Sequence, residues 1–171
     1  DAVAISTIFI NTNLAACGGV LVAAVIPRLM SGKTDVIMML NGAIGGLVAI
    51  TAEPLAPSPL AAILIGGIGG LLVVFGTKLL FSLKIDDVVG AVPAHLFAGI
   101  WGTLAVPITN SGANFGTQLL GVIAINATVF VIAFIIWAVM KNTFGIRLSK
   151  EAEIKGTDVT ETGVIAYAIR D

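Results

Sequence analysis

Five long apolar segments, separated by short polar breaks, determine what this chain of 171 residues can fold into. They cover residues 3–26, 36–52, 59–83, 88–108 and 117–140. A helix needs about 20 apolar residues to cross the hydrocarbon core of a bilayer, and these segments are close to that length. Only 11% of the residues are charged, whereas soluble domains average about 25%. The sequence therefore predicts an all-α integral membrane protein with five transmembrane helices.

The distribution of basic residues predicts the orientation. Eight of the nine Lys and Arg residues follow the first, third or fifth segment, and Lys78 lies near the end of the third, whereas the loops after the second and fourth segments contain none. Basic residues concentrate on the cytoplasmic side of membrane proteins. The first segment is therefore expected to enter from outside, and the C-terminus to lie in the cytoplasm.

The chain divides into a transmembrane domain, residues 1–141, and a more polar cytoplasmic tail, residues 142–171. The tail still carries several apolar residues, so we expect it to dock against the cytoplasmic face. Asp158, with Glu161 three residues later, is expected to begin a short helix. The N-terminal residues enter an apolar segment directly, and we expect this sequence to be cut from a longer protein.

Glycine pairs at helical spacing occur in two of the segments. Gly42 and Gly46 lie in the second, and Gly66 and Gly70 lie in the third. Small residues four apart let neighbouring membrane helices approach closely. We interpret both pairs as packing surfaces without further function.

Polar residues inside the segments are candidates for helix contacts or for lining a pathway. Asn11, Thr12 and Asn13 are consecutive and cannot all face one surface, so at least one is expected to bond a neighbouring helix. Asn41 and Thr51 lie near opposite ends of the second segment. Either could line a pathway, although a Thr hydroxyl often bonds its own helix.

His95 is the single histidine of the chain, and it lies within an apolar segment. It follows Asp87 by eight residues, which places it about 12 Å into the membrane at 1.5 Å per residue. A polar group left unpaired in hydrocarbon costs about 2–7 kcal/mol, so the imidazole is expected to face a polar partner, a water-filled cavity or a substrate. Asp86 and Asp87 are expected at the cytoplasmic start of this helix, where one caps free amides. Pro93 is expected to bend the helix beside His95.

Several functional classes are not supported by the sequence. No second His, Cys or carboxylate stands at metal-ligand spacing from His95, and no cofactor motif or catalytic triad is recognisable, so an enzyme is not indicated. The net charge of −1 argues against nucleic-acid binding. The residues alone lead to a membrane protein with a histidine in a conduction or relay path.

Three stretches resemble the ammonium transporter family (Amt/Mep/Rh). Residues 84–107, KIDDVVGAVPAHLFAGIWGTLAVP, are similar to the family signature, and NGAIGGLVAIT at 41–51 resembles an earlier helix. Residues 147–167, RLSKEAEIKGTDVTETGVIAY, resemble the family's cytoplasmic C-terminus. The resemblance runs through the whole chain in the family's order.

This resemblance implies the last five helices of an eleven-helix homotrimer in the cell (plasma or inner) membrane. Each subunit of such a trimer conducts ammonium or ammonia, and possible substrates include methylammonium, through a narrow apolar pore lined by two histidines. His95 matches the second of these, and Thr51 matches a threonine of the pathway. Asp86 and Asp87 match the acidic pair at the cytoplasmic helix start. A PII-type regulatory protein at the cytoplasmic face is the implied partner.

Two residues depart from the family pattern, and two other functions stay open. Glu53 follows Thr51 where a Pro and a small-residue turn are usual, which places a carboxylate at the outer mouth, and Pro93 is not common to all members. One alternative function is an ammonium sensor or signalling module coupled to a cytoplasmic partner. The other is a proton-coupled carrier of a different solute.

Overall fold

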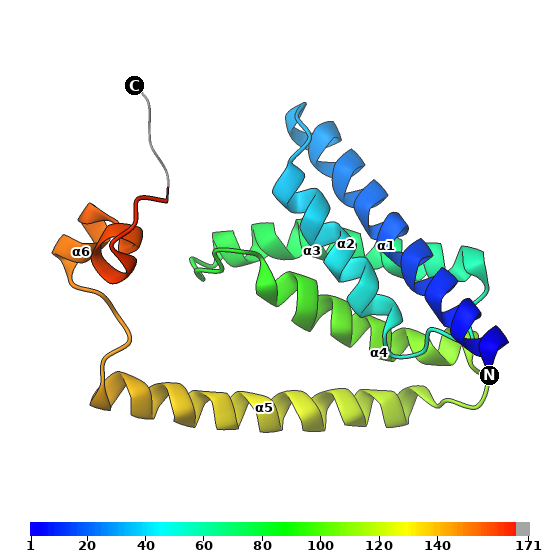
Figure 1. Cartoon of the computed structure of the whole chain (residues 1–171). Coiled ribbons are helices and arrows are strands. Elements are labelled where there is room, and N and C mark those ends of the chain that lie inside the picture. The colour runs from blue at the N-terminus through cyan, green and yellow to red at the C-terminus, as the bar shows by residue number, and fades with distance from the viewer. Residues whose placement is uncertain (167–171) are drawn as a thin grey trace. The chain divides into compact units, whose positions relative to one another are not determined.

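The computed structural model describes residues 1–166, and within this range its regular secondary structure consists of helices joined by loops (Figure 1). The long helices are α1 (Ala2–Ser31), α2 (Val36–Ile50), α3 (Pro59–Ser82), α4 (Ala98–Thr109) and α5 (Phe115–Thr143). A π-helical turn, η1 (Val92–Phe97), leads directly into α4. Two short elements follow α5, namely α6 (Lys150–Lys155) and a π-helical turn, η2 (Asp158–Thr162).

Four helical segments of the described range are long and apolar enough to cross a membrane. They are α1, α3, the continuous segment Val92–Thr109, and α5. The second predicted span, α2, has 15 residues and rises only about 22 Å, which is less than the hydrocarbon core of about 30 Å. It ends at Ile50 because Pro54 and Pro57 follow closely and cannot continue a helix.

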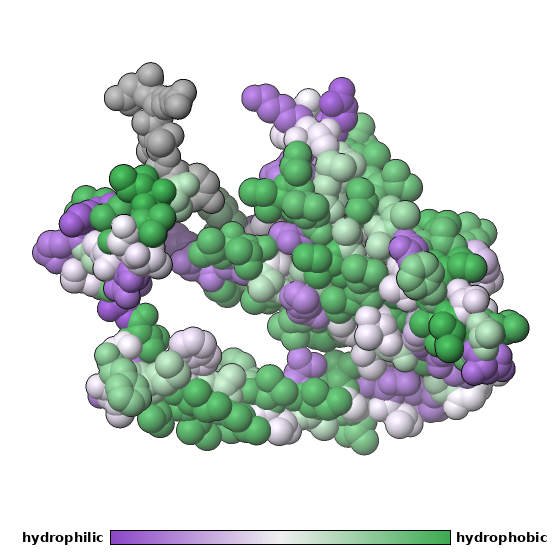
Figure 2. Space-filling view, viewed as in Figure 1, coloured by the Kyte–Doolittle hydropathy of each residue, from purple (hydrophilic) through white to green (hydrophobic). Residues whose placement is uncertain are grey.

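Contacts within the chain define two compact units, the first covering Asp1–Ile125 and the second beginning at Asn126. The first unit holds α1 to α4 and the start of α5. The remainder of α5 and the elements after it belong to the second unit. Apolar side chains cover much of the surface in Figure 2, as expected of a protein whose solvent is lipid.

One face of α1 packs against both predicted glycine pairs. A Cβ added to Gly46 or to Gly66 would collide with the backbone of Ala15. A Cβ added to Gly42 or to Gly70 would likewise collide with the backbone of Gly19. The predicted packing role of the two pairs is confirmed, because the small residues bring α2 and α3 into backbone contact with the same stripe of α1.

The parallel course of α2 and the η1–α4 segment is visible in their contacts. Asn41 lies beside Gly90, and Ala49 lies beside Gly102, so both chains advance in the same direction. Successive membrane spans alternate in direction, so the second and fourth predicted spans are required to be parallel, as α2 and α4 are. Trp101 fixes α4 to α3 by donating its Nε1–H to the Ile65 carbonyl at 3.0 Å.

Asn11 corrects the prediction made for the polar triplet of α1. Its side chain is 1% exposed, and its Nδ2 donates to the carbonyls of Pro54 at 2.9 Å and Pro57 at 2.8 Å. These acceptors belong to the loop between α2 and α3 rather than to a neighbouring helix. A proline-containing loop leaves carbonyls that no helix satisfies, and the Asn11 amide supplies two donors to them. Asn13 instead bonds the Phe9 carbonyl of its own helix at 2.8 Å.

The described part of the tail contains a short helix and a π-helical turn. Ser149 caps α6 by accepting from the Ala152 amide at 3.2 Å, and Arg147 pairs with Glu153 at 3.1 Å. Asp158 begins η2 as expected, but its carboxylate accepts from the Ala166 amide at 2.9 Å rather than capping the turn. Docking of the tail stays a prediction, and its residues Tyr167, Ile169 and Arg170 lie outside the described range.

Candidate functional site

His95 lies within the π-helical turn η1. In this turn the Ala98 amide donates back five residues to the Pro93 carbonyl, whereas an α-helix reaches back four. The bend expected at Pro93 therefore takes the form of a widened turn. Such turns are rare in proteins, and those that occur often lie at functional sites. The Pro93 and Phe97 side chains pack on Gly76 of α3, where an added Cβ would come within 2.6 Å of Phe97.

The imidazole of His95 is exposed on the surface of the first unit. It forms no hydrogen bond with any other residue between 1 and 166. The neighbouring Pro93 and Ala94 are buried, so η1 is held against α2 and α3 while His95 points away from that contact. Within residues 1–166, the fold presents the ring rather than enclosing it.

Asp87, one member of the acidic pair, holds the loop that leads into η1. Its Oδ1 accepts from the Ala91 amide and its Oδ2 from the Val92 amide, both at 2.9 Å. The carboxylate thus satisfies two free donors at the helix start, as predicted. The helix begins at Val92 rather than at residue 88, because Gly90 adopts a left-handed conformation with φ +73°.

Asn41 completes this approach from α2. Its Nδ2 donates to the Val89 carbonyl at 2.8 Å. In a continued helix this carbonyl would accept from residue 93, but Pro93 has no N–H. The Asn41 amide therefore replaces a missing backbone donor. Gly90 must be glycine here for a second reason, since an added Cβ would lie 2.6 Å from Asn41 Nδ2.

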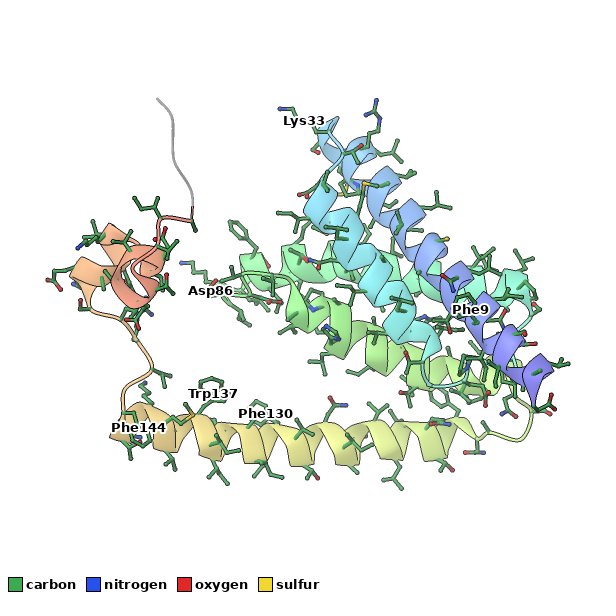
Figure 3. All side chains as sticks on the ribbon, viewed as in Figure 1. Phe9, Lys33, Asp86, Phe130, Trp137 and Phe144 are labelled. Carbon is green, nitrogen blue, oxygen red and sulfur yellow. The ribbon has the colours of Figure 1, made fainter. Side chains whose placement is uncertain are left out.

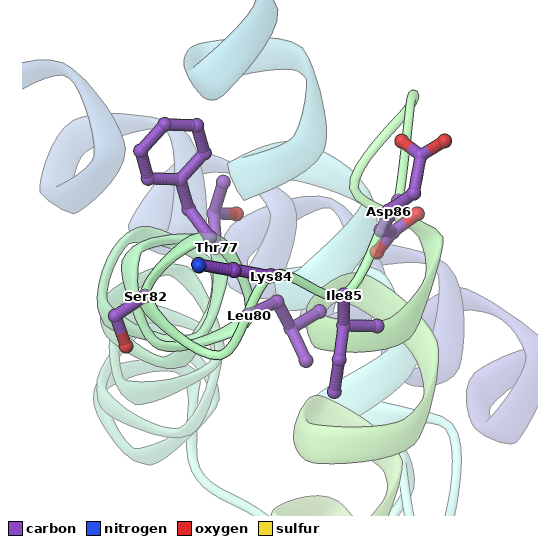
Figure 4. A pocket seen from close by; sticks show the side chains of 8 residues that line it. Thr77, Leu80, Ser82, Lys84, Ile85 and Asp86 are labelled. Atoms are coloured by element: carbon purple, nitrogen blue, oxygen red, sulfur yellow. The ribbon is translucent and has the colours of Figure 1, made fainter.

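A pocket of about 790 Å³ opens beside this loop (Figure 4). It is lined by Thr77, Leu80, Phe81, Ser82, Lys84, Ile85, Asp86 and Asp87. Asp86 is exposed, and its carboxylate makes no hydrogen bond within the described chain. Figure 3 shows Asp86 on the loop that joins α3 to η1. One carboxylate of the pair is thus structural, and the other is available at the pocket.

Thr51 ends α2, and its hydroxyl donates to the Leu47 carbonyl at 2.7 Å. This is the bond to its own helix that the sequence left open as an alternative. Two residues later, Glu53 accepts from the Asn110 amide at 3.0 Å, which ties the end of α2 to the end of α4. The sequence did not reveal this pair, because the two residues are 57 positions apart.

The candidate residues occupy three levels along the parallel α2 and η1–α4 segments. Asn41 lies level with Gly90, at the end where Asp86 and Asp87 are found. Val48 lies level with Gly99, which places His95 near the middle and Thr51 beyond, toward the opposite end. The fold brings Asn41 and Asp87 together around one loop, but it keeps Thr51 apart from His95.

These features define a multi-pass helical membrane protein in which His95 has no hydrogen-bond partner among residues 1–166. The sequence profile of the Ammonium Transporter Family matches residues 1–167. The chain therefore belongs to the ammonium transporter family. Its long apolar helices agree with this assignment.

Individual relatives and solved structures support the same family. The chain is 38% identical to "Ammonium transporter Amt2" of Archaeoglobus fulgidus over 95% of its own length and 39% of that protein. It is 34% identical to "Ammonium transporter" of Bacillus subtilis, over 93% and 43% respectively. A solved "Sensor Amt Protein" superposes with a TM-score of 0.86 at 30% identity, covering 93% of this chain and 42% of that one. The N240A mutant of Candida albicans Mep2 superposes with a TM-score of 0.77 at 26% identity. The chain thus spans about two fifths of the length of these relatives.

Proposed function

We propose that the protein to which this chain belongs moves ammonium or ammonia across the cell membrane, with His95 touching the permeating species. The observation that carries the proposal is the exposed imidazole on η1, in a chain of the ammonium transporter family, at a position that the sequence predicts to lie within the membrane. A ring at this depth needs a polar neighbour, since an unpaired polar group in hydrocarbon costs about 2–7 kcal/mol. A second pore histidine from the rest of the protein, together with the substrate, would supply it.

The chemistry follows from the imidazole. In its neutral form it offers one donor and one acceptor, so it can hydrogen-bond ammonia or pass on a proton taken from ammonium. A narrow apolar pore strongly disfavours a bare ion, which excludes potassium and sodium while neutral ammonia can pass. A relay of this kind needs no metal or cofactor.

The other candidate residues take different roles in this proposal. Thr51 borders the outer part of the path. Asn41 sets the shape of the cytoplasmic end through its bond to Val89, and Asp87 holds the start of the His95 turn. Asp86 lines the pocket through which substrate would leave.

The arrangement of the whole protein is also part of the proposal. Residues 1–141 form the transmembrane domain, the tail from residue 142 lies in the cytoplasm, and the subunits form a homotrimer. The basic residues near the C-terminal ends of α1, α3 and α5 and just beyond them support this orientation. A PII-type regulator at the cytoplasmic face would contact the tail.

The test is methylammonium uptake by cells that lack their own ammonium transporters and express the full-length protein. His95→Ala should lower uptake by at least about tenfold, because one hydrogen bond to the substrate accounts for roughly that factor. Leu96→Ala is the control, since Leu96 is the next residue of the same turn and is 40% exposed. Unchanged flux and selectivity in His95→Ala, at equal expression, would refute the role of His95.

A second candidate, an ammonium sensor, is favoured by the superposition on the "Sensor Amt Protein". In this case the membrane domain binds ammonium and reports to a cytoplasmic partner through the tail. Two findings together would support it. The full gene would encode a signalling domain after Asp171, and the full-length protein would give no uptake in the assay above.

A further inference from the structure

A polar pocket of about 490 Å³ lies at the end of α4, between the α2–α3 loop and the start of α5. Its polar side chains come from both loops and from the first turn of α5, and they are Glu53, Asn110, Asn114, Thr117 and Gln118. All of them precede Asn126 and therefore belong to the first compact unit. The pocket lies at the opposite end of α4 from Asp86 and Asp87, which in the proposed orientation is the outer end.

Glu53 is the one charged residue among those that line this pocket. Its Oε2 accepts from Asn110 Nδ2 at 3.0 Å, and its Oε1 has no hydrogen-bond partner within residues 1–166. Asn110 is itself held in place, because its Oδ1 accepts from the Gly112 amide at 2.9 Å. One oxygen of the carboxylate is therefore fixed, and the other is free to meet a ligand.

The negative charge of Glu53 has no counterion in the part of the chain that the structure describes. The ion pair found there joins Arg147 and Glu153 in the tail. Lys33 precedes α2 and Lys84 follows α3, whereas Glu53 lies on the loop at the other ends of these helices. The 15 residues of α2 rise about 22 Å, which exceeds the screening length of about 8 Å at physiological ionic strength. A cation from solution would supply the missing partner.

The neutral groups of the pocket suit a cation that donates hydrogen bonds. The Thr117 hydroxyl and the Gln118 side-chain amide have no partner within residues 1–166, and both offer an oxygen acceptor. An ammonium ion carries a single positive charge and donates N–H bonds, so it matches one carboxylate and several neutral oxygens. Divalent metal ions prefer more carboxylate ligands, and residues 1–166 hold no group of three His, Cys, Asp or Glu that could bind one.

We propose that this pocket holds an ammonium-type cation at the Glu53 carboxylate before the cation enters the membrane path. The inference rests on the proposed function, for which it names an entry site formed by this chain. Glu53 departs from the family pattern, so the site is a feature of this chain rather than of every member. A carboxylate in a pocket raises the local concentration of a cation, so it lowers KM and leaves the maximal rate unchanged.

The test is methylammonium uptake over a range of concentrations, in the cells described above. Glu53→Gln keeps an oxygen acceptor for Asn110 and removes only the charge. Its KM should rise about tenfold at an unchanged maximal rate, which is the factor for one hydrogen bond to a charged group. Glu53→Asp, which keeps the charge, should stay closer to the wild type than Glu53→Gln does.

Asp1→Asn is the matched control. Asp1 caps α1, whose N-terminal half bonds the α2–α3 loop, so it lies at the same end of the fold but outside the pocket. Asn can replace it as a cap while removing one negative charge, and KM should stay unchanged. An unchanged KM in Glu53→Gln would overturn the proposal. An equal rise in the two variants, or a lower maximal rate at unchanged KM in Glu53→Gln, would also overturn it.

A second experiment tests charge and access at the same position. Glu53→Cys is treated from outside with membrane-impermeant methanethiosulfonate reagents that add either a sulfonate or a trimethylammonium group. The sulfonate should lower KM toward the wild-type value and the trimethylammonium group should not, whereas wild-type protein should respond to neither. Equal effects of the two reagents would overturn the role of charge. Absence of labelling would overturn the site, because the pocket would then be covered in the whole protein.

A binding measurement separates failure of this site from failure of the proposed function. Ammonium chloride should raise the thermal midpoint of the full-length wild type in detergent more than that of Glu53→Gln. Tetramethylammonium chloride, whose cation has no N–H donor, should not distinguish the two proteins. If this difference is present without any uptake, the site holds and transport is refuted. If uptake depends on His95 but not on Glu53, transport holds and the site is refuted.

Discussion

Asn11 gives the sharpest prediction about stability. Asn11→Ala removes two donors and leaves two loop carbonyls without partners, namely Pro57 in a buried position and Pro54 in a partly buried one. An orphaned buried acceptor costs about 1–3 kcal/mol. We assign about 2 kcal/mol to Pro57 and about 1 kcal/mol to Pro54, where water can partly replace the donor. The total is about 3 kcal/mol, which corresponds to a fall in thermal midpoint of about 6–12 °C for a protein domain of this size.

The assay is thermal unfolding of the full-length protein in detergent, followed by tryptophan fluorescence. Asn13→Ala is the matched control, because Asn13 is two residues away, is exposed, and bonds only its own helix. Its midpoint should move by less than about 2 °C, as expected for a surface substitution. Equal shifts in the two variants would refute the reasoning, since they would show that the bonds to the loop do not stabilise the fold.

Three further predictions rest on separate features. Gly66→Ala should destabilise the protein by about 2 kcal/mol, because the new Cβ collides with the Ala15 backbone. Gly67→Ala, at the next position, should leave the stability unchanged. Equal thermal unfolding midpoints for the two variants would contradict this prediction. Gly90→Ala should cost about 1–3 kcal/mol through its left-handed φ and its contact with Asn41, and a normal unfolding curve would exclude that strain. The Ala166 amide donates to the Asp158 carboxylate and lowers its pKa below the usual value of 3.8. The bond therefore stabilises this turn at pH values above 3.8 and is lost only as the pH falls through the lower pKa of the folded protein. An NMR titration of the Ala166 amide with a midpoint at or above pH 3.8 would contradict this prediction.

Features that depend on residues close in sequence were predictable. The glycine pairs at Gly42 and Gly66 follow from a spacing of four, and the cap at Asp87 follows from a carboxylate just before a helix. The end of α2 follows from the prolines after it, whereas the helix start predicted at residue 88 was wrong, because Gly90 adopts a left-handed conformation and the helix begins at Val92. Helical periodicity and capping are local properties, and a single sequence displays them directly.

Features that depend on which helices meet were not predictable. The partner of Asn11 is a loop 43–46 residues away, and the partner of Glu53 is Asn110. The use of Asn41 as a substitute donor for Pro93 depends on α2 lying beside η1. His95 stood out as a polar group in an apolar segment, but its exposed position was decided by packing on Gly76 and could not be read from the segment alone.

The π-helical turn lies between two contacts with α2, and a regular α-helix would fix the angle between these contacts. Before the turn, Gly90 lies against Asn41 of α2, and after it Gly102 lies against Ala49 of the same helix. One extra residue within Val92–Phe97 absorbs the difference in angle between these two contacts. A deletion of one residue between Val92 and His95 would therefore rotate the His95 ring by about 100° around the helix axis relative to the contact at Gly90.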